Sequence, residues 1–239
     1  MPHIFSQTKD VSLCSDQEKE AFYRLLCQGF LGVSQQDFIR DFEEKDAVMI
    51  LRKEHSEGEI VGWSTVMVLT LALPDEEVKG VFSGDTVVLP EYRSSTGMGV
   101  ELVRYFLRAY EQFPRHKVYY LLTSKGWRTY KIMPFYFQEY APRYERPTTA
   151  HEKTLMDAFG HKKYPGHYDS ETGIITYGSQ RVRPEGVDAA PLHPDARTAF
   201  FLRCNPRYLD GHELVCVARI APDNFTSQAR RLARLERET

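Results

Sequence analysis

The sequence predicts a mixed α/β (α+β) fold, with a largely antiparallel central sheet flanked by helices and a C-terminal extension. Three apolar, β-branched segments follow one another through short polar connections, as in an antiparallel meander. A glycine-containing loop and an amphipathic helix then lead into a further strand-like segment, as in a crossover between parallel strands. With 239 residues, of which 42% are hydrophobic, the chain can bury a substantial core.

Two helices are predicted before the first strand. Ser15 and Glu18 have the spacing of a capping box, in which each side chain accepts a hydrogen bond from the other residue's backbone amide. Ser34 is a suitable N-cap for a second, shorter helix. The apolar residues that follow recur at helical spacing: Phe22, Leu25, Leu26 and Phe30 in the first helix, Phe38 and Phe42 in the second.

The strands of the meander are predicted at residues 47–52, 60–73 and 78–89. An amphipathic helix is expected from Gly99 to Pro114, and residues 117–124 (KVYYLLTS) form the next strand. Because a strand, a crossover helix and a second strand form a right-handed unit, we expect the strands on either side of this helix to be parallel neighbours.

The connection between strand and helix, LPEYRSSTGMG, is the most informative segment of the chain. The strand ends at Pro90, and the helix begins at the second glycine of a loop rich in Ser, Thr and Gly. Such a loop directs unpaired backbone N–H groups and the positive end of a helix dipole at one point, where phosphate oxygens bind well. The segment therefore predicts a phosphorylated ligand.

The remaining residues are less regular. Residues 125–140 have a helical pattern in which Pro134 must kink or end the helix. Thr149 and Glu152 form a second capping box, residues 213–220 are a strand candidate, and residues 223–237 a final helix. We therefore divide the chain into a core, residues 1–145, and an extension, residues 146–239, which either completes the same sheet or forms an appendage.

This order of elements, and the segment VVLPEYRSSTGMG in particular, resembles the GNAT superfamily of acyl-CoA-dependent N-acyltransferases. In that family a strand leads through Pro and Arg into a glycine-rich loop that binds the pyrophosphate, and Gly97 and Gly99 match its pair of small residues. The resemblance covers about residues 10–140. The chain departs from the pattern at Ser94, where the family has Gln or Arg, and the arginine here is Arg93, one residue earlier.

The resemblance implies an acyl-CoA co-substrate, acetyl-CoA or another acyl-CoA. Its pyrophosphate would contact the loop amides, with Arg93 adding a charge-assisted contact or remaining a solvated loop residue. Its pantetheine arm would pair with the strand before the loop. Ser124 lies near a position that contacts the cofactor in the family, although capping of the next helix explains it equally well. The implied cofactor-binding residues are Val87, Val88, Leu89, Arg93, Ser94, Ser95, Thr96, Gly97, Met98, Gly99 and Ser124.

The resemblance also implies a base and, in many members, a tyrosine acid. Several members have a glutamate at the position of Ser83. By strict alternation Ser83, Asp85 and Val87 share one face of the strand, so Asp85 is the nearest carboxylate and the candidate base. Tyr130 is the candidate acid by offset and Tyr136 the second choice, although core packing accounts for either tyrosine.

We thus predict transfer of an acetyl or other short acyl group to an amine of a small molecule or peptide. The alternative is a non-catalytic GNAT-like module that binds acyl-CoA as a sensor. A net charge of −2 gives no reason to expect nucleic acid, and the basic C-terminal segment is explained by a solvated helix face, or by an interaction helix. No apolar run is long enough to span a membrane.

The four cysteines and eight histidines have no zinc spacing, so we expect free thiols, no metal site and a cytoplasmic protein. A homodimer is compatible with the sequence.

Overall fold

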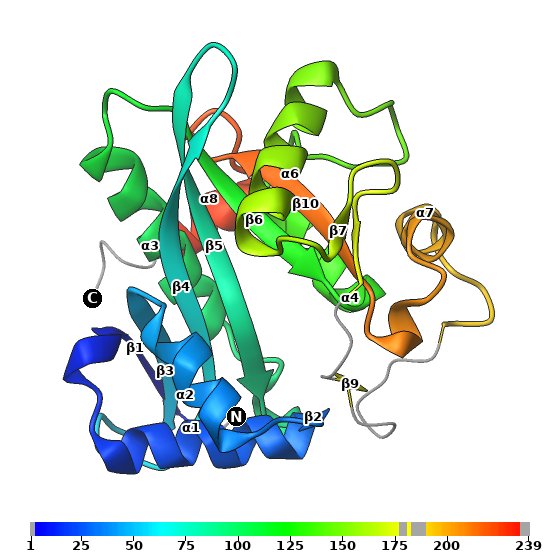
Figure 1. The fold of residues 1–239 in the computed structure, drawn as a ribbon. Coiled ribbons are helices and arrows are strands. Elements are labelled where there is room, and N and C mark those ends of the chain that lie inside the picture. Colours follow the sequence, from blue (N-terminus) through cyan, green and yellow to red (C-terminus); the bar gives the residue numbers. More distant parts are fainter. Residues whose placement is uncertain (1–2, 177–180, 183–189, 235–239) are drawn as a thin grey trace.

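The computed structural model describes residues 3–176, 181–182 and 190–234. Its centre is an eight-stranded mixed sheet (Figure 1). β5 and β6 are parallel, and every other pair of neighbours is antiparallel. Across the sheet the strands are β1 (Ile4–Asp10), β3 (Ala47–Lys53), β4 (Ile60–Ala72), β5 (Glu77–Val88), β6 (Val118–Ser124), β10 (Glu213–Arg219), β8 (Ile174–Ile175) and β7 (Tyr168–Asp169). A separate two-stranded sheet pairs β2 (Phe30–Leu31) with β9 (Arg181–Val182).

Helices cover both faces of the large sheet. On one face lie α1 (Asp16–Gly29), α2 (Gln35–Glu43) and α6 (Ala150–Lys163) (Figure 1). On the other face lie α3 (Gly97–Gln112), α5 (Ile132–Tyr136) and α8 (Ser227–Arg234). The short helices α4 (Trp127–Tyr130) and α7 (Ala196–Cys204) pack together beyond the end of β6.

The core consists of three apolar clusters, which follow from the alternation of side chains along the strands. Phe106 of α3 and Tyr120 of β6 centre the cluster on the α3 face. On the opposite face, Phe159 of α6 packs on Phe82 of β5, and Phe22 of α1 packs on Trp63 of β4. Both faces of the sheet are therefore closed by helices, as a mixed sheet with apolar residues on both sides requires.

The predicted fold class is confirmed, including the antiparallel meander β3–β4–β5 and the parallel pair β5–β6. Both capping boxes are present: Ser15 with Glu18 starts α1, and Thr149 with Glu152 starts α6. Ser34 caps α2 by accepting the amide of Asp37. The strand predicted at residues 213–220 is β10. The final helix is α8, and residues 235–237 of that prediction lie outside the described residues.

Pro134 interrupts the helical pattern of residues 125–140, as predicted. The segment forms two short helices, α4 and α5, which are separated at Lys131, because Pro134 lacks the N–H that would bond the Tyr130 carbonyl.

Two expectations about elements are corrected by the structure. α3 begins at Gly97, the first glycine of the loop, because Val100 N–H already bonds the Thr96 carbonyl. The sequence analysis also missed β1, which pairs with β3 at the edge of the sheet.

The C-terminal segment is built into this architecture. β10 pairs with β6 along six residues, α6 covers β4 and β10, and α8 packs on α3. No described helix is both long and apolar enough to cross a membrane.

Candidate active site

The candidate site begins where β5 and β6 separate. The two strands pair only from Lys79 to Phe82 on β5 and from Val118 to Leu121 on β6. Beyond that point β5 stays with β4, and β6 stays with β10. Among the described strands, none pairs with Ser83–Val88 on the side that faces β6. The backbone there is free to pair with an added extended ligand.

The direction of the backbone groups decides which residues could do so. Leu89 N–H donates to the Val61 carbonyl of β4 at 3.0 Å, so Val87 and Leu89 are turned toward β4. The N–H and C=O of Val88, between them, therefore point to the open side. The Val88 carbonyl already accepts the Arg93 Nε at 3.2 Å. Of the three residues predicted to pair with pantetheine, the geometry favours Val88 alone.

The loop after β5 holds several backbone amides without an acceptor. Arg93 and Ser95 N–H bond the Pro90 and Tyr92 carbonyls in a 3-10 turn, and Gly97 N–H reaches Ser95 Oγ at 3.4 Å. Within the described residues, the amides of Ser94, Thr96, Met98 and Gly99 have no partner. The last three lie at the start of α3, where the helix dipole is positive. This is the geometry that binds an anion.

Gly97 and Gly99 of the loop are required by packing within the protein. A Cβ on Gly97 would lie 2.9 Å from Leu51 Cδ2 and 3.2 Å from Ser6 Cβ, and one on Gly99 would lie 2.7 Å from the Tyr136 hydroxyl. Both glycines therefore allow α3 to pack closely on its own protein neighbours. Their side of the backbone is covered by the protein and does not face a ligand.

The predicted residues Arg93 and Ser124 have partners within the chain. Arg93 is exposed, and its Nε holds the Val88 carbonyl. Ser124 is fully buried, and its hydroxyl donates to the Gly126 carbonyl at 2.9 Å. The N-cap of α4 is Gly126, so Ser124 does not cap that helix.

A β-bulge sets the direction of the candidate base. Ser64 pairs with Thr86 and Val66 with Ser83, so Thr65 alone stands opposite both Gly84 and Asp85. The extra residue reverses the alternation. Ser83 consequently faces α3 and shares a hydrogen bond of 2.7 Å with the buried Tyr120 hydroxyl. Asp85 faces α2 instead, so the expectation that Ser83 and Asp85 share one face is wrong.

Asp85 lies among four charged side chains: Asp41 of α2, Glu213 of β10, and the loop residues Lys45 and Lys125. Burial raises the pKa of its carboxyl, an effect that Lys125 and Lys45 oppose and Asp41 and Glu213 reinforce. Within the described residues Asp85 has no hydrogen bond or ion pair of its own. A half-buried carboxylate with a raised pKa and no partner is well suited to exchange a proton with a ligand.

Each lysine around Asp85 is paired with a different carboxylate. Lys45 Nζ lies 2.6 Å from Asp41 Oδ2, and its side chain is fully buried. Lys125 Nζ lies 3.3 Å from Glu213 Oε1. Lys163, the last residue of α6, lies 2.6 Å from the carboxylate of Glu44 at the C-cap of α2 and 3.8 Å from that of Asp41, and these contacts hold α6 against α2 beside the site. These pairs compensate the neighbouring charges and leave the Asp85 carboxylate available.

The two tyrosines predicted as acids lie on the other face of the sheet from Asp85. Tyr130 is completely buried, and its hydroxyl donates to the Pro142 carbonyl at 2.9 Å among Tyr140, Phe200 and Phe201. Tyr136 is also buried, with its hydroxyl against Gly99. Burial raises the pKa of both tyrosine hydroxyls well above the ordinary value, that of Tyr130 the more. The structure brings neither tyrosine to Asp85.

Sequence reasoning missed Tyr164 and Lys45, which do lie beside Asp85. Tyr164 follows α6, and its ring packs against Phe82, where β5 and β6 separate. Its hydroxyl bonds Thr123 on the diverging end of β6, and burial raises its pKa well above the ordinary value. Neither residue carries a local signal, because α2 and α6 meet only through long-range packing.

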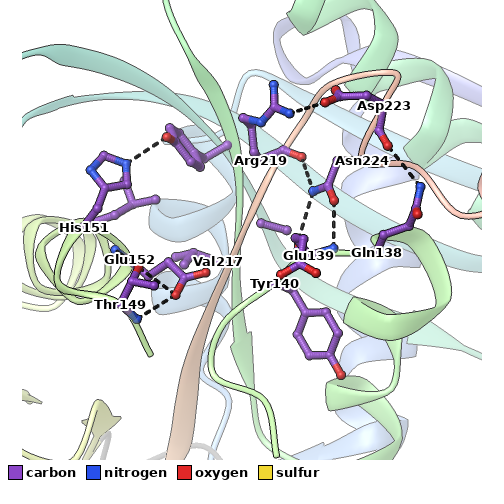
Figure 2. A pocket seen from close by; sticks show the side chains of 13 residues that line it. Gln138, Glu139, Tyr140, Thr149, His151, Glu152, Val217, Arg219, Asp223 and Asn224 are labelled. Atoms are coloured by element: carbon purple, nitrogen blue, oxygen red, sulfur yellow. Dashed lines mark hydrogen bonds and ion pairs between the residues drawn. The ribbon is translucent and has the colours of Figure 1, made fainter. Parts of the chain in front are cut away.

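The described residues contain no cluster of three or more side chains suited to a metal ion. A cavity of about 410 Å³ lies beside the start of β6, and its lining side chains are drawn in Figure 2. Its polar walls satisfy one another: Tyr119 bonds His151 at 2.9 Å, and the Asn224 amide holds the backbone of Glu139 and Arg219. It lies away from Asp85 and the loop.

No protein-family model and no curated protein matches the sequence. Solved structures do resemble it. A conserved Enterococcus faecalis V583 protein of unknown function, described as a probable N-acyltransferase, is 11% identical with a TM-score of 0.43, over 58% of this chain and 33% of that one. The GNAT family N-acetyltransferase YhbS from Escherichia coli, in complex with CoA, is 14% identical with a TM-score of 0.37, over 52% and 64%.

A Trypanosoma brucei acetyltransferase is 16% identical with a TM-score of 0.38, over 62% of this chain and 98% of that one. The chain thus spans less than two thirds of the E. faecalis and E. coli proteins. It is similar in fold to GNAT acetyltransferases. Because these TM-scores are below 0.5, the function must be inferred from the chain's own strand order and site.

Proposed function

We propose that the chain is an acyl-CoA-dependent N-acyltransferase, which moves an acetyl or other short acyl group to an amine of a small molecule or peptide. The observation that carries the proposal is the separation of β5 from β6. It leaves an unpaired strand edge with free loop amides at one end and the unpartnered carboxylate of Asp85 beside it.

The residues present fit the co-substrate. The amide N–H groups of Thr96, Met98 and Gly99 would donate hydrogen bonds to diphosphate oxygens, with Arg93 nearby, and the backbone of Val88 would pair with the pantetheine arm. Acyl-CoA, when bound, supplies an activated thioester. The chain's own part is to hold that ligand along β5 and to manage the protons.

Asp85 is the proposed base. Its ionised carboxylate accepts a proton from the ammonium form of the acceptor or from the attacking amine. Tyr164 is the tyrosine placed to donate a proton on the same side of the sheet, and we propose it as the acid ahead of Tyr130 and Tyr136. None of the four cysteines forms a disulfide bond, which supports a reducing compartment such as the cytoplasm.

A second candidate function is a module that binds acyl-CoA without turnover. One observation favours it: Ser83, at the position where family members have glutamate, is buried and bonded to Tyr120. In this case Asp85 would be a neighbour of the ligand without a catalytic role.

Binding is tested by thermal unfolding with acetyl-CoA. At 100 times its dissociation constant a ligand stabilises a protein by about 2.7 kcal/mol, which gives a clear rise in melting temperature. Met98→Pro removes one free loop amide without removing a helical hydrogen bond, so it should reduce the rise. Met98→Ala truncates the same side chain, keeps the amide and should retain the rise. Equal shifts for the two variants would contradict the cradle.

Turnover distinguishes the enzyme from the module. Purified protein with acetyl-CoA and a panel of small and peptide amines should release free thiol in an amine-dependent manner. Asp85→Asn should lower this rate about 10²–10⁴-fold while keeping the acetyl-CoA thermal shift. A thermal shift with no thiol release for any amine supports the module instead.

A further inference from the structure

The edge of the sheet at β1 has binding features that do not depend on the proposed function. β1 is the outermost strand of the eight-stranded sheet (Figure 1). Val11 N–H donates to the Asp46 carbonyl, and Glu54 N–H donates to the His3 carbonyl. Odd-numbered residues therefore exchange hydrogen bonds with the β3 side, and the even-numbered ones direct their backbone N–H and C=O groups outward.

The outer edge of β1 is open. Within the described chain, the outward backbone groups of Ile4, Ser6 and Thr8 have no partner. Proteins usually protect such an edge with a proline, a bulge or a free lysine. β1 has a continuous register with β3 and contains no proline, and its one lysine, Lys9, is held by Glu18 at 2.7 Å. An unprotected edge of this length is a template for an added strand.

A groove of about 1000 Å³ lies beside this edge, between β1 and the helices α3 and α8. The buried carboxylate of Glu101 lies at the wall of the groove and accepts hydrogen bonds from Ser6 Oγ, Thr8 Oγ1 and Arg104. The charge of Glu101 is therefore compensated within the protein. Arg108 and Arg230 also line the groove, and neither forms an ion pair with a carboxylate of the described residues. Their two guanidinium groups outnumber the one remaining carboxylate, Glu111.

We propose that this edge and groove bind an extended, acidic peptide segment of a partner protein, which adds to β1 as a further strand. The outward groups of Ser6 and Thr8 supply main-chain hydrogen bonds, and Arg108 and Arg230 select acidic side chains. Pairing between two copies of β1 is disfavoured, because a two-fold axis at this edge would bring the arginine-lined grooves of both copies together.

The test uses a fluorescein-labelled peptide of alternating Glu and Val, nine residues long, and its Lys–Val counterpart, in fluorescence anisotropy at low salt. The acidic peptide should bind, and binding should weaken as salt is added. Ser6→Pro removes an outward N–H and the Ser6 hydroxyl, whereas Ser6→Ala removes only the hydroxyl. The proline variant should bind up to about tenfold more weakly than the alanine variant, as for the loss of one main-chain hydrogen bond.

Arg108→Glu should also weaken binding of the acidic peptide. Arg24→Glu makes the same change of charge on the exposed surface of α1 and should leave binding unchanged. If Ser6→Pro fails to fold, hydrogen exchange on the wild-type protein replaces it: the acidic peptide should protect the amides of Ser6 and Thr8. Equal binding of both peptides, or binding without protection of these amides, overturns the proposal. So does a concentration-dependent dimer in sedimentation that Ser6→Pro abolishes, which would show a second copy at this edge.

Discussion

Asp85 owes its position to the glycine before it. A Cβ on Gly84 would lie 2.5 Å from Thr65 Oγ1 and 3.0 Å from Lys45 Cε, so only glycine lets the bulge close against α2. The bulge then turns Asp85 to the face where Lys45, Lys125 and Tyr164 gather. Burial on this face raises the pKa of the Asp85 carboxyl. For the same reason, the ionised carboxylate lowers the free energy of unfolding.

Asp85→Asn should therefore stabilise the protein while it removes the proposed base. A carboxyl whose pKa is raised in the folded state destabilises the fold as it ionises. The penalty is absent well below the ordinary value of 3.8 and grows as pH rises through the raised pKa. Urea unfolding from pH 4 to 8 should show an advantage of the variant that increases with pH. An advantage that is constant with pH would contradict this view of Asp85.

Asp195→Asn provides a control of opposite sign. Lys131 and the amide of Thr198 hold the pKa of Asp195 below its ordinary value, so its charge stabilises the fold at neutral pH. That contribution is lost as pH falls through the lowered pKa. The variant should be less stable than the wild type at pH 7 and should approach it in acid.

The substitutions Tyr130→Phe and Tyr164→Phe should have different effects on stability and turnover. Tyr130→Phe leaves the buried Pro142 carbonyl without its donor, which should lower the free energy of unfolding by about 1–3 kcal/mol and leave turnover nearly unchanged. Tyr164→Phe should lower the rate of thiol release and move the alkaline limb of its pH profile. A larger loss of turnover in Tyr130→Phe would restore Tyr130 as the acid.

At the scale of elements, the bulge in β5 is the feature on which the site depends. Gly84→Ala should destabilise the protein by about 1–3 kcal/mol through overpacking against Thr65. Thr65 Oγ1 is buried without a hydrogen-bond partner among the described residues, so Thr65→Ala sacrifices no bond. The double variant should recover much of the loss in chemical denaturation. Strictly additive effects would show that the two positions do not touch.

The elements differ in how far the sequence predicts them. α1 and α6 have capping boxes and apolar spacing, both local signals, and their starts are correct. β1 has a polar pattern, IFSQTKD, and becomes a strand only by pairing with β3 some forty residues later. The bulge at Gly84 and Asp85 is equally invisible, because alternation along β5 assumes one residue opposite each residue of β4. The glycine-containing loop between β5 and α3 is recognisable from its sequence. Tyr164, in contrast, reaches Asp85 only through tertiary packing.

At the scale of the whole molecule, the C-terminal segment contributes to two of the three core clusters. β10 covers the edge of β6, Phe159 of α6 packs on Phe82 at 5.3 Å, and α8 packs against α3. These contacts close the sheet on both faces. The segment therefore stabilises the elements that position the candidate site.

A chain that ends at Glu145 should consequently fail to fold cooperatively. Its sheet would expose Phe82 and Leu121, which α6 covers, to water, a loss too large for a marginally stable domain. Near-ultraviolet circular dichroism and thermal unfolding would show a weak signal without a sharp transition. A cooperative transition in this fragment, with acetyl-CoA binding intact, would identify residues 146–239 as an appendage.

The buried Trp63 is a natural fluorescent probe of the sheet beside the candidate site. Trp63 on β4 is 1% exposed, donates its indole N–H to the Phe22 carbonyl and stands opposite Val87 on β5. The only other tryptophan, Trp127, lies beside Arg128 and Lys131. Replacing it with Phe leaves Trp63 as the single tryptophan, between α1 and the strand that borders the site, and excitation at the red edge of the tryptophan band selects it over the tyrosines. The emission maximum of Trp63 would then report, without an added label, whether a ligand bound along β5 changes the exposure of the α1 face of the sheet to water.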